Sequence, residues 1–248
     1  ALIVANKRML NLPQGGTAIG TGVNAHKDFP RYFCNALEKV TGFNVKPTSN
    51  FFQGLSAQDN SSELSSAVKN LSLSLLKISN DLRWMNSGPL TGLSDIELEA
   101  LQPGSSIMPG KVNPVIPEAV AMACADVIGN DLTISIGAQS GSFQLNVMLP
   151  VIAYNLLKSI TLMGNCMPLL AKKCIKTFKI NEQNNLQNLH RNPILVTALN
   201  PIIGYKKAAE IAKKAYKEKR AIIDVASEMT TIERKELESL LDPKNLIK

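Results

Sequence analysis

The sequence predicts an all-α protein, a bundle of long helices followed by a small helical C-terminal domain. Apolar residues recur at alternating steps of four and three along residues 64–85, which is the spacing of one face of a long helix. Only 5% of the residues are aromatic, while Leu, Ile, Ala, Ser and Lys abound, and this composition suits helices better than a β-sandwich. Because 45% of the 248 residues are hydrophobic, the chain can bury a sizeable core.

The N-terminal residues 1–11 read as the end of a helix already under way, because they carry no start signal. We therefore expect a fragment or a processed chain, with further residues upstream of Ala1. The glycine-rich run Gly15 to Gly22 follows no strand and precedes no P-loop lysine in register. A close backbone crossing in a helical bundle is the favoured interpretation of this run.

A short helix is predicted over 29–40, then an irregular connection over 44–60, then the clearest helix of the chain. One of residues 60–62 is expected to cap that helix, and Ser87-Gly88-Pro89 to stop it. Its predicted apolar stripe consists of Leu64, Val68, Leu71, Leu75, Ile78, Leu82 and Met85.

Two further long helices are predicted over 114–136 and 145–176, the second bent by Pro150 and Pro168. The polar, asparagine-rich residues 181–192 are interpreted as a linker or surface turn. Shorter helices follow over 205–219, near 222–229 and after residue 231. The predicted domains are therefore an N-terminally incomplete helical-bundle domain over 1–180 and a small helical domain over 181–248.

The composition argues against several kinds of partner. The net charge is +7, but the lysines are spread along the chain in no dense run, so nucleic-acid binding is not expected. Two histidines and four cysteines show no metal spacing, so buried free thiols, no metal and no cofactor are expected. No apolar run is judged long enough to span a membrane, and no membrane association is predicted.

The segment Gly104 to Pro114, here called the signature loop, is too broken by glycine and proline to be a helix or a strand. Asn113-Pro114 reads as a helix N-cap followed by proline at the first helical position. A helix start beside Lys111 favours an anion, most simply a carboxylate or a phosphate. The two serines are then ligands, or one of them is a base. If each residue of the loop is considered alone, the alternative interpretation is an ordinary connecting loop that happens to contain a lysine.

The whole string Gly104-Ser105-Ser106-Ile107-Met108-Pro109-Gly110-Lys111-Val112-Asn113 resembles the signature of the fumarase/aspartase superfamily, and class II fumarase in particular. Four other segments resemble the superfamily in the same order, and the likeness covers essentially the entire chain. These segments are residues 15–22, 79–83, 141–146 and 195–201.

The resemblance implies a fumarate hydratase that interconverts L-malate and fumarate by anti elimination through an aci-carboxylate. It places the catalytic base at Ser105 and a substrate carboxylate at Ser106. Lys111, Asn113 and the backbone around Val112 would hold the remaining negative charges. Glu118 matches the glutamate that pairs with a catalytic histidine.

That histidine lies in a Thr-His-x-Gln-Asp segment in the family, and this sequence contains no such segment. The family also builds each site from three subunits of a homotetramer, so this chain alone is expected to be inactive. The expected compartment is the cytoplasm, with the mitochondrial matrix as the alternative.

Two other functions stay open. Val115-Ile116-Pro117, Gln144 and Gln58 depart from the usual fumarase pattern, and the first two lean toward aspartate ammonia-lyase. A non-catalytic structural role, as in lens crystallins of the superfamily, is the alternative of another class. The presence of Ser105, Lys111, Asn113 and Glu118 argues against it.

Overall fold

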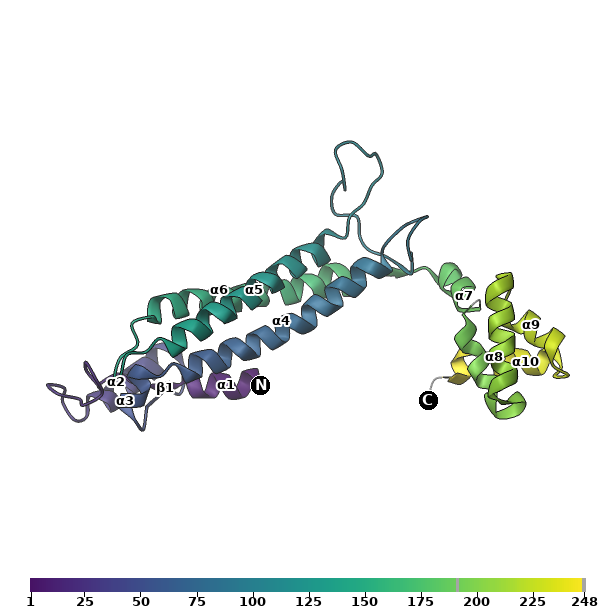
Figure 1. The fold of residues 1–248 in the computed structure, drawn as a ribbon. Coiled ribbons are helices and arrows are strands. Elements are labelled where there is room, and N and C mark those ends of the chain that lie inside the picture. The colour runs from purple at the N-terminus through teal and green to yellow at the C-terminus, as the bar shows by residue number, and fades with distance from the viewer. Residues whose placement is uncertain (191, 247–248) are drawn as a thin grey trace. The chain divides into compact units, whose positions relative to one another are not determined.

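The computed structural model describes residues 1–190 and 192–246, and they form two compact units. The first unit consists of residues 1–86 and 98–178, and the second of residues 87–97 together with the chain from residue 179 onward. Figure 1 shows helices in both units, and the strands are pairs of two residues, so the predicted all-α fold is confirmed. Unlike the predicted domains, the second unit includes residues 87–97.

The first unit is built on three long helices, α4, α5 and α6, which run side by side with α5 in the middle (Figure 1). Its elements are α1 (Leu2–Met9), β1 (Asn11–Leu12), α2 (Phe29–Thr41), β2 (Lys46–Pro47), α3 (Phe51–Ser56), α4 (Asp59–Met85), α5 (Val115–Gln139), α6 (Leu149–Leu170) and the π-helix η1 (Ala171–Ile175).

The buried seam of α4 differs from the predicted apolar stripe. Ile78 of the predicted stripe is 41% exposed, whereas four serines are buried. The buried positions recur at steps of four and three along Ser61, Ser65, Val68, Ser72, Leu75, Ser79 and Leu82. Four residues of the predicted stripe, Leu64, Val68, Leu75 and Leu82, are buried as predicted. The prediction missed the four serines because it counted serine as polar, although a small side chain lets a neighbouring helix approach closely.

Polar groups pair across the two interfaces of α5. In the interface with α4, the Ser65 hydroxyl donates to Asp131 over 2.7 Å, and the Lys69 ammonium contacts the other oxygen of this carboxylate at 2.6 Å. In the interface with α6, the Asn130 amide donates to the Ser159 hydroxyl over 3.2 Å. Because such pairs are satisfied in one alignment of the helices, they fix how far each helix is shifted along its neighbour.

Several predicted helix boundaries are corrected by the structure. The helix α4 begins at Asp59, so none of residues 60–62 is its cap. Pro150 lies in the first turn of α6, where proline is accommodated without a bend, while Pro168 lies inside the helix and the π-helix η1 follows it. The connection over 44–60 contains α3, which Asn50 caps by accepting from the Gln53 N–H.

Helix α5 is long and apolar enough to cross a membrane by length and composition, contrary to the prediction that no run is long enough. This test is also passed by the core helices of soluble proteins. Its ion pairs with neighbouring helices, Asp131 with Lys69 and Asp126 with Lys158, are those of a helix inside a protein bundle.

The glycine-rich run is a close backbone crossing, as predicted. A Cβ added at Gly20 would lie 2.6 Å from the backbone of Phe52 in α3, and Gly20 has φ +100°. Both features exclude a larger residue at this position.

The buried Asn146 connects the C-terminal end of α5 with α3. Its side-chain amide donates to the Gly137 and Ala138 carbonyls at the end of α5. The Asn146 backbone N–H donates to Leu55 of α3.

The second unit combines the segment 87–97 with the C-terminal helices. Its elements are β3 (Ile96–Glu97), β4 (Lys179–Ile180), α7 (Glu182–His190), the 3₁₀ helices η2 (Pro193–Leu199) and η3 (Pro243–Leu246), α8 (Asn200–Glu218), α9 (Ile222–Met229) and α10 (Arg234–Leu240). Strands β3 and β4 pair antiparallel, and the Asn184 and Asn185 amides donate to carbonyls of Leu93, Ser94 and Asp95. The predicted linker over 181–192 was therefore wrong, because most of it is α7.

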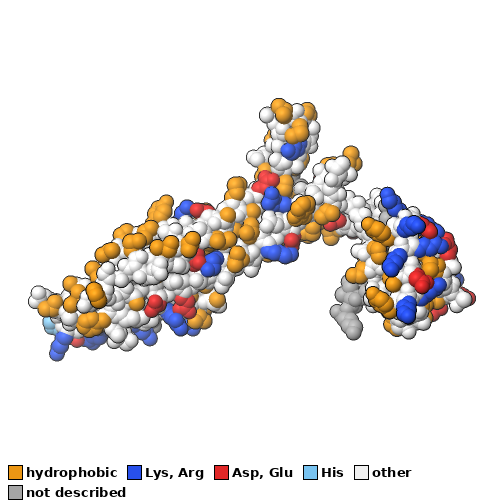
Figure 2. Space-filling view, in the orientation of Figure 1, with side chains coloured by type: hydrophobic (Ala, Val, Ile, Leu, Met, Phe, Trp, Pro, Cys, Tyr) orange, Lys and Arg blue, Asp and Glu red, His pale blue; other side chains and the backbone are white. Residues whose placement is uncertain are grey.

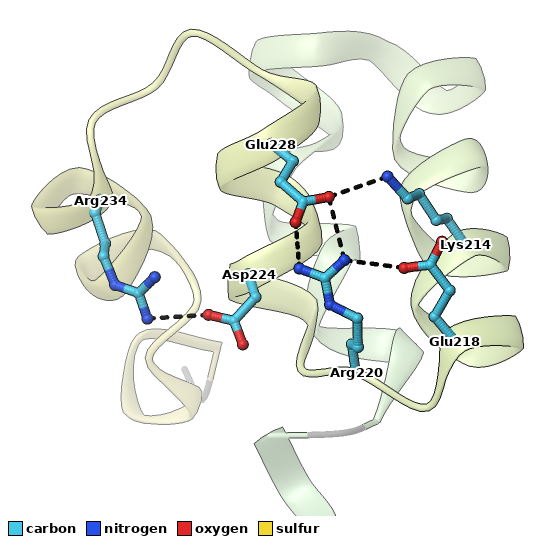
Figure 3. Close-up of polar contacts among 6 residues, drawn as sticks. All are labelled: Lys214, Glu218, Arg220, Asp224, Glu228 and Arg234. Atoms are coloured by element: carbon cyan, nitrogen blue, oxygen red, sulfur yellow. Dashed lines mark hydrogen bonds and ion pairs between the residues drawn. The ribbon is translucent and has the colours of Figure 1, made fainter.

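The α8–α10 region has its own apolar core and a surface network of charges. The core includes Leu199, Ile211, Val225 and Leu237, all fully buried. Figure 3 shows Arg220 between two carboxylates: it donates to Glu228 with both terminal nitrogens and to Glu218 with one, and Lys214 also contacts Glu228. The hydrogen bonds from Arg220, then from Lys214, lower the pKa of Glu228 from 4.5 to about 2.

The Lys69–Asp131 pair yields a stability prediction. Lys69→Met leaves the Asp131 carboxylate buried with Ser65 as its remaining partner, and we expect a loss of about 1–3 kcal/mol in the free energy of unfolding. The Asp131 side chain is 7% exposed and that of Lys69 31%, so solvent screens the pair only in part. Urea denaturation at fixed protein concentration measures the loss, and the double variant Lys69→Met/Asp131→Leu is expected to recover much of it. Equal losses in the single and double variants would contradict this account.

The Glu228 network yields a pH prediction. Since the folded pKa of Glu228 is lower than its ordinary value, the carboxylate stabilises the fold above about pH 4.5, and this contribution is lost as the pH falls toward about 2. Glu228→Gln is therefore expected to lower the melting temperature at about pH 6 and to have little effect at about pH 2. Thermal unfolding followed by circular dichroism measures both. Glu236→Gln, at an exposed carboxylate outside the network, is the matched control, and an equal effect of both variants at neutral pH would refute the role of the network.

Candidate active site

The signature loop lies where the chain enters α5. Ahead of it, the Asn86 side chain at the end of α4 accepts the backbone N–H of Leu98 over 2.8 Å, and the Leu98 side chain is buried. The signature loop then projects from the bundle before α5 begins (Figure 1). The site residues are therefore carried by a loop whose two ends are attached to packed helices of the first unit.

Two hydrogen bonds join Gly104 to Lys111 and Asn113, and they close the base of the signature loop, here called its neck. The Gly104 N–H donates to the Lys111 carbonyl over 2.7 Å, and the Asn113 side-chain amide donates to the Gly104 carbonyl over 3.1 Å. A Cβ on Gly104 would lie 2.7 Å from the Lys111 oxygen, so no larger side chain fits there without a shift. The glycine at this position is thus explained by a close approach of two backbone segments.

Ser105 lies at this neck and accepts hydrogen bonds from the backbone of its own loop. Its hydroxyl oxygen accepts the N–H of Ile107 over 3.2 Å and that of Met108 over 3.3 Å. Two amide dipoles directed at one oxygen favour a negative charge on that oxygen. The Ser105 residue is half-buried, so its hydroxyl is neither sealed in the core nor fully solvated.

The predicted substrate-binding residues share this loop. Ser106, Lys111 and Val112 are exposed, and Asn113 is half-buried. Within residues 1–190 and 192–246, no ion pair is recorded for Lys111, so its charge is available to a ligand. The loop therefore collects a cation, two hydroxyls and an amide over nine residues.

The start of α5 corrects one sequence prediction. Asn113 is not the N-cap: Pro114 occupies that position and the helix begins at Val115. Since Pro114 has no side-chain donor or acceptor, the first amides of α5 receive no side-chain cap. Asn113 instead donates its side-chain amide to the Gly104 carbonyl.

Glu118 lies in the first turn of α5 and is half-buried. A carboxylate in this position interacts favourably with the helix dipole. Among the described residues it forms no recorded ion pair, so the structure leaves it without a cationic partner in this chain.

Sequence reasoning missed the two amide donors of Ile107 and Met108 and the closure of the loop neck. The two N–H donors could have been predicted from the sequence, because serine hydroxyls often accept from the N–H two or three residues later in a local turn. The neck closure could not, because nothing in the spacing of Gly104 and Asn113 states that the chain doubles back.

In the part of the chain that the structure describes, no group of three or more His, Cys, Asp and Glu is arranged to hold a metal. Burial raises the pKa of the Cys124 thiol to about 11, with a smaller contribution from Cys166, so this thiol stays protonated and unreactive.

The helical bundle, with a polar loop between two of its long helices, has the architecture that the resemblance to the fumarase/aspartase superfamily implies. The family model described as "Lyase" matches residues 2–129, and that described as "Fumarase C C-terminus" matches residues 195–248. The chain belongs to this lyase family, in agreement with the resemblance found in the sequence.

Relatives and solved structures agree with this assignment. The chain is 60% identical over 235 residues to "Fumarate hydratase class II 2" of Pseudomonas aeruginosa, which covers 95% of this chain and 51% of the relative. It is 42% identical over 240 residues to an aspartate ammonia-lyase of Helicobacter pylori, covering 97% and 51%. A class II fumarase structure from Schistosoma mansoni superposes with a TM-score of 0.94 at 32% identity, covering 99% of this chain and 54% of that one. The chain thus spans about half the length of the curated relatives it matches.

Proposed function

We propose that the protein to which this chain belongs is a fumarate hydratase that interconverts fumarate and L-malate by anti addition and elimination of water. The observation that carries the proposal is the environment of Ser105, a hydroxyl that accepts two backbone amides in a loop with an exposed lysine. The names of relatives 57–60% identical to this chain support the same reaction.

The roles of the residues follow from the charge that develops in the reaction. Removal of a proton beside a carboxylate turns that group into an aci-carboxylate with a second negative charge. Ser105 is the base that takes the proton, and the N–H groups of Ile107 and Met108 stabilise its ionised form. Backbone donors of this kind are strong contributors, since removing a single oxyanion donor costs about 10²–10³ in kcat in well-studied enzymes.

The other loop residues bind the dicarboxylate. Ser106 donates to one carboxylate, while Lys111, Asn113 and the backbone at Val112 hold the second carboxylate and the charge that builds on it. A positive charge close to the reacting carbon acts more strongly on the intermediate, which carries more negative charge, than on the substrate. Neither a metal nor another cofactor is assigned a role in this reaction.

Glu118 is the partner of a catalytic histidine that this sequence does not contain. The carboxylate orients the imidazole and raises its basicity, so that it can transfer a proton to or from the departing water. The complete site therefore combines the signature loop with segments outside this chain, and we propose that it is shared between subunits of a homotetramer.

The exposed face of α5 supports assembly. Met122 is 68% exposed, Leu132 63% and Ile136 48%, and Ala125 and Gly129 lie between them at steps of three and four. The opposite faces of α5 already pack on α4 and α6, so this helix is apolar all round, as helices inside a larger core are. Figure 2 shows hydrophobic side chains gathered along the bundle. A second copy of the same bundle is the partner that this face fits.

Aspartate ammonia-lyase is the alternative reaction. It is favoured by the 42% identity to the aspartate ammonia-lyase of Helicobacter pylori and by Gln144 in the segment after α5. A non-catalytic structural role is the third candidate, and the presence of Ser105, Lys111, Asn113 and Glu118 argues against it. We place the protein in the cytoplasm, with the mitochondrial matrix as the alternative.

The test of the proposed function uses the full-length protein with L-malate and with L-aspartate in separate assays. We expect turnover of L-malate, and Ser105→Ala to lower kcat by about 10²–10⁴ because the base is removed. Ser106→Ala, the matched substitution one residue along, is expected to raise KM instead. Formation of fumarate is followed by its ultraviolet absorbance.

Three results would count against this proposal. Turnover of L-aspartate in place of L-malate would favour the ammonia-lyase, and unchanged kcat in Ser105→Ala would remove the base. The 248-residue chain alone is expected to be inactive, because it lacks the histidine segment. Hydration of fumarate by this chain alone would contradict the shared site.

The assembly has its own test. Leu132→Asp places a charge in the exposed apolar face of α5, and we expect the full-length protein to dissociate from a tetramer to smaller species, because an unpaired buried charge is costly. Light scattering coupled to size-exclusion chromatography measures the mass. Leu186→Asp, at an exposed leucine of α7, is the control and is expected to remain assembled. A tetramer formed by Leu132→Asp would show that this face lies outside the interface.

A further inference from the structure

The position of Asn113 assigns it a second task besides binding substrate. Its side-chain amide is occupied by the Gly104 carbonyl over 3.1 Å, a contact that crosses the neck of the signature loop. The Gly104 N–H donates to the Lys111 carbonyl over 2.7 Å at the same place. These two hydrogen bonds, here called the neck clasp, join both strands of the loop where it leaves the bundle.

The neck clasp acts directly on the peptide group that leads into Ser105. The Gly104 carbonyl and the Ser105 N–H belong to one planar peptide, so a donor that fixes the carbonyl also fixes the plane from which Ser105 continues. The Ser105 oxygen must then meet the N–H groups of Ile107 and Met108 two and three residues later. These contacts lie within residues 105–108, so the plane of the Gly104–Ser105 peptide fixes the direction in which this whole turn, with the Ser105 hydroxyl and its two donors, leaves the neck.

The loop has few other restraints. Ile107, Met108, Gly110 and Lys111 are exposed, and a Cβ at Gly110 would meet nothing within 4 Å. Apart from the neck clasp, its recorded backbone hydrogen bonds include a turn from the Lys111 N–H to the Met108 carbonyl at 3.2 Å. The loop is thus held at its neck rather than by packing against the bundle, and the loss of one clasp bond is a large fraction of what holds it.

We propose that Asn113 is a positioning residue, which with Gly104 and Lys111 closes the signature loop and thereby fixes where the turn that carries Ser105 and its two amide donors lies relative to the bundle. This proposal rests on the proposed function for its catalytic consequence, but the clasp itself is a property of the loop. It also explains the residue choices at both ends: an amide donor at Asn113, and at Gly104 a residue with no Cβ to strike the Lys111 carbonyl.

The test compares two substitutions in the full-length protein that break the neck clasp by different means. Asn113→Leu keeps the size of the side chain and removes the donor, while Gly104→Ala adds a methyl group 2.7 Å from the Lys111 oxygen and removes no polar group. We expect both to speed hydrogen exchange of amides 105–111 by about 3- to 10-fold, the value of one hydrogen bond. Both are also expected to lower kcat about tenfold or more, because the base is displaced.

The controls repeat the same chemical changes elsewhere. Asn188→Leu is at an exposed position of α7, and Gly164→Ala adds a methyl group in open space on α6. Neither is expected to change exchange in the loop. For Gly104→Ala we further expect KM to change less than kcat, since no group that contacts substrate is lost.

The outcomes separate the clasp from the proposed function. Unchanged loop exchange in Asn113→Leu, or a rise in KM as the sole effect of that variant, would overturn the positioning role and leave Asn113 a substrate ligand. Faster exchange with unchanged kcat would overturn it equally. If the wild-type protein consumes neither L-malate nor L-aspartate while both variants still loosen the loop, the proposed function fails and the clasp stands.

Discussion

The alignment of α5 along α4 is the constraint on which the rest of the first unit depends. Serine side chains at the seam allow a close approach, and the Asp131 carboxylate meets Ser65 and Lys69 in one alignment of the two helices. Because α5 begins directly after the signature loop, this alignment also places the second end of that loop. The charged contact in the middle of the bundle and the polar loop at its end are therefore parts of one framework.

The loop itself is a different kind of structure from the helices that carry it. Its shape comes from hydrogen bonds made by its own backbone and by Asn113, with little burial of apolar surface. Such a segment can present amides and a lysine to a small anion without first breaking a packed core. A rigid bundle with a locally closed loop separates the stability of the fold from the chemistry of the site.

Much of the fold could be predicted from the sequence, because long helices leave a periodic pattern. The all-α fold, the three long helices and the helices over 29–40 and 222–229 were evident from apolar spacing and from glycine and proline. The seam of α4 was not, since burial of serine depends on the partner helix and not on hydrophobicity. Helix α7 was missed for a related reason: the Asn184 and Asn185 side chains serve carbonyls more than 80 residues away, which a local pattern cannot reveal.

For the candidate site, the residue types and their order were predictable, and their hydrogen bonds were only partly so. The serines, lysine and asparagine stand out in the sequence, but Asn113 was taken for a helix cap because asparagine before proline is typical of one. Its amide reaches Gly104 because the chain folds back on itself at the neck, and the order of residues in the sequence does not reveal that contact.

Because residues 87–97 belong to the second unit, the chain passes from one unit to the other three times, after residues 86, 97 and 178. A truncation after residue 178 would therefore do more than remove a C-terminal appendage. It would strip β3 of its only recorded strand partner and leave the carbonyls of residues 93–95 without the asparagines of α7, on the stretch that leads into the signature loop. The smaller unit thus holds residues 87–97, the segment that follows α4, through strand pairing and the asparagines of α7.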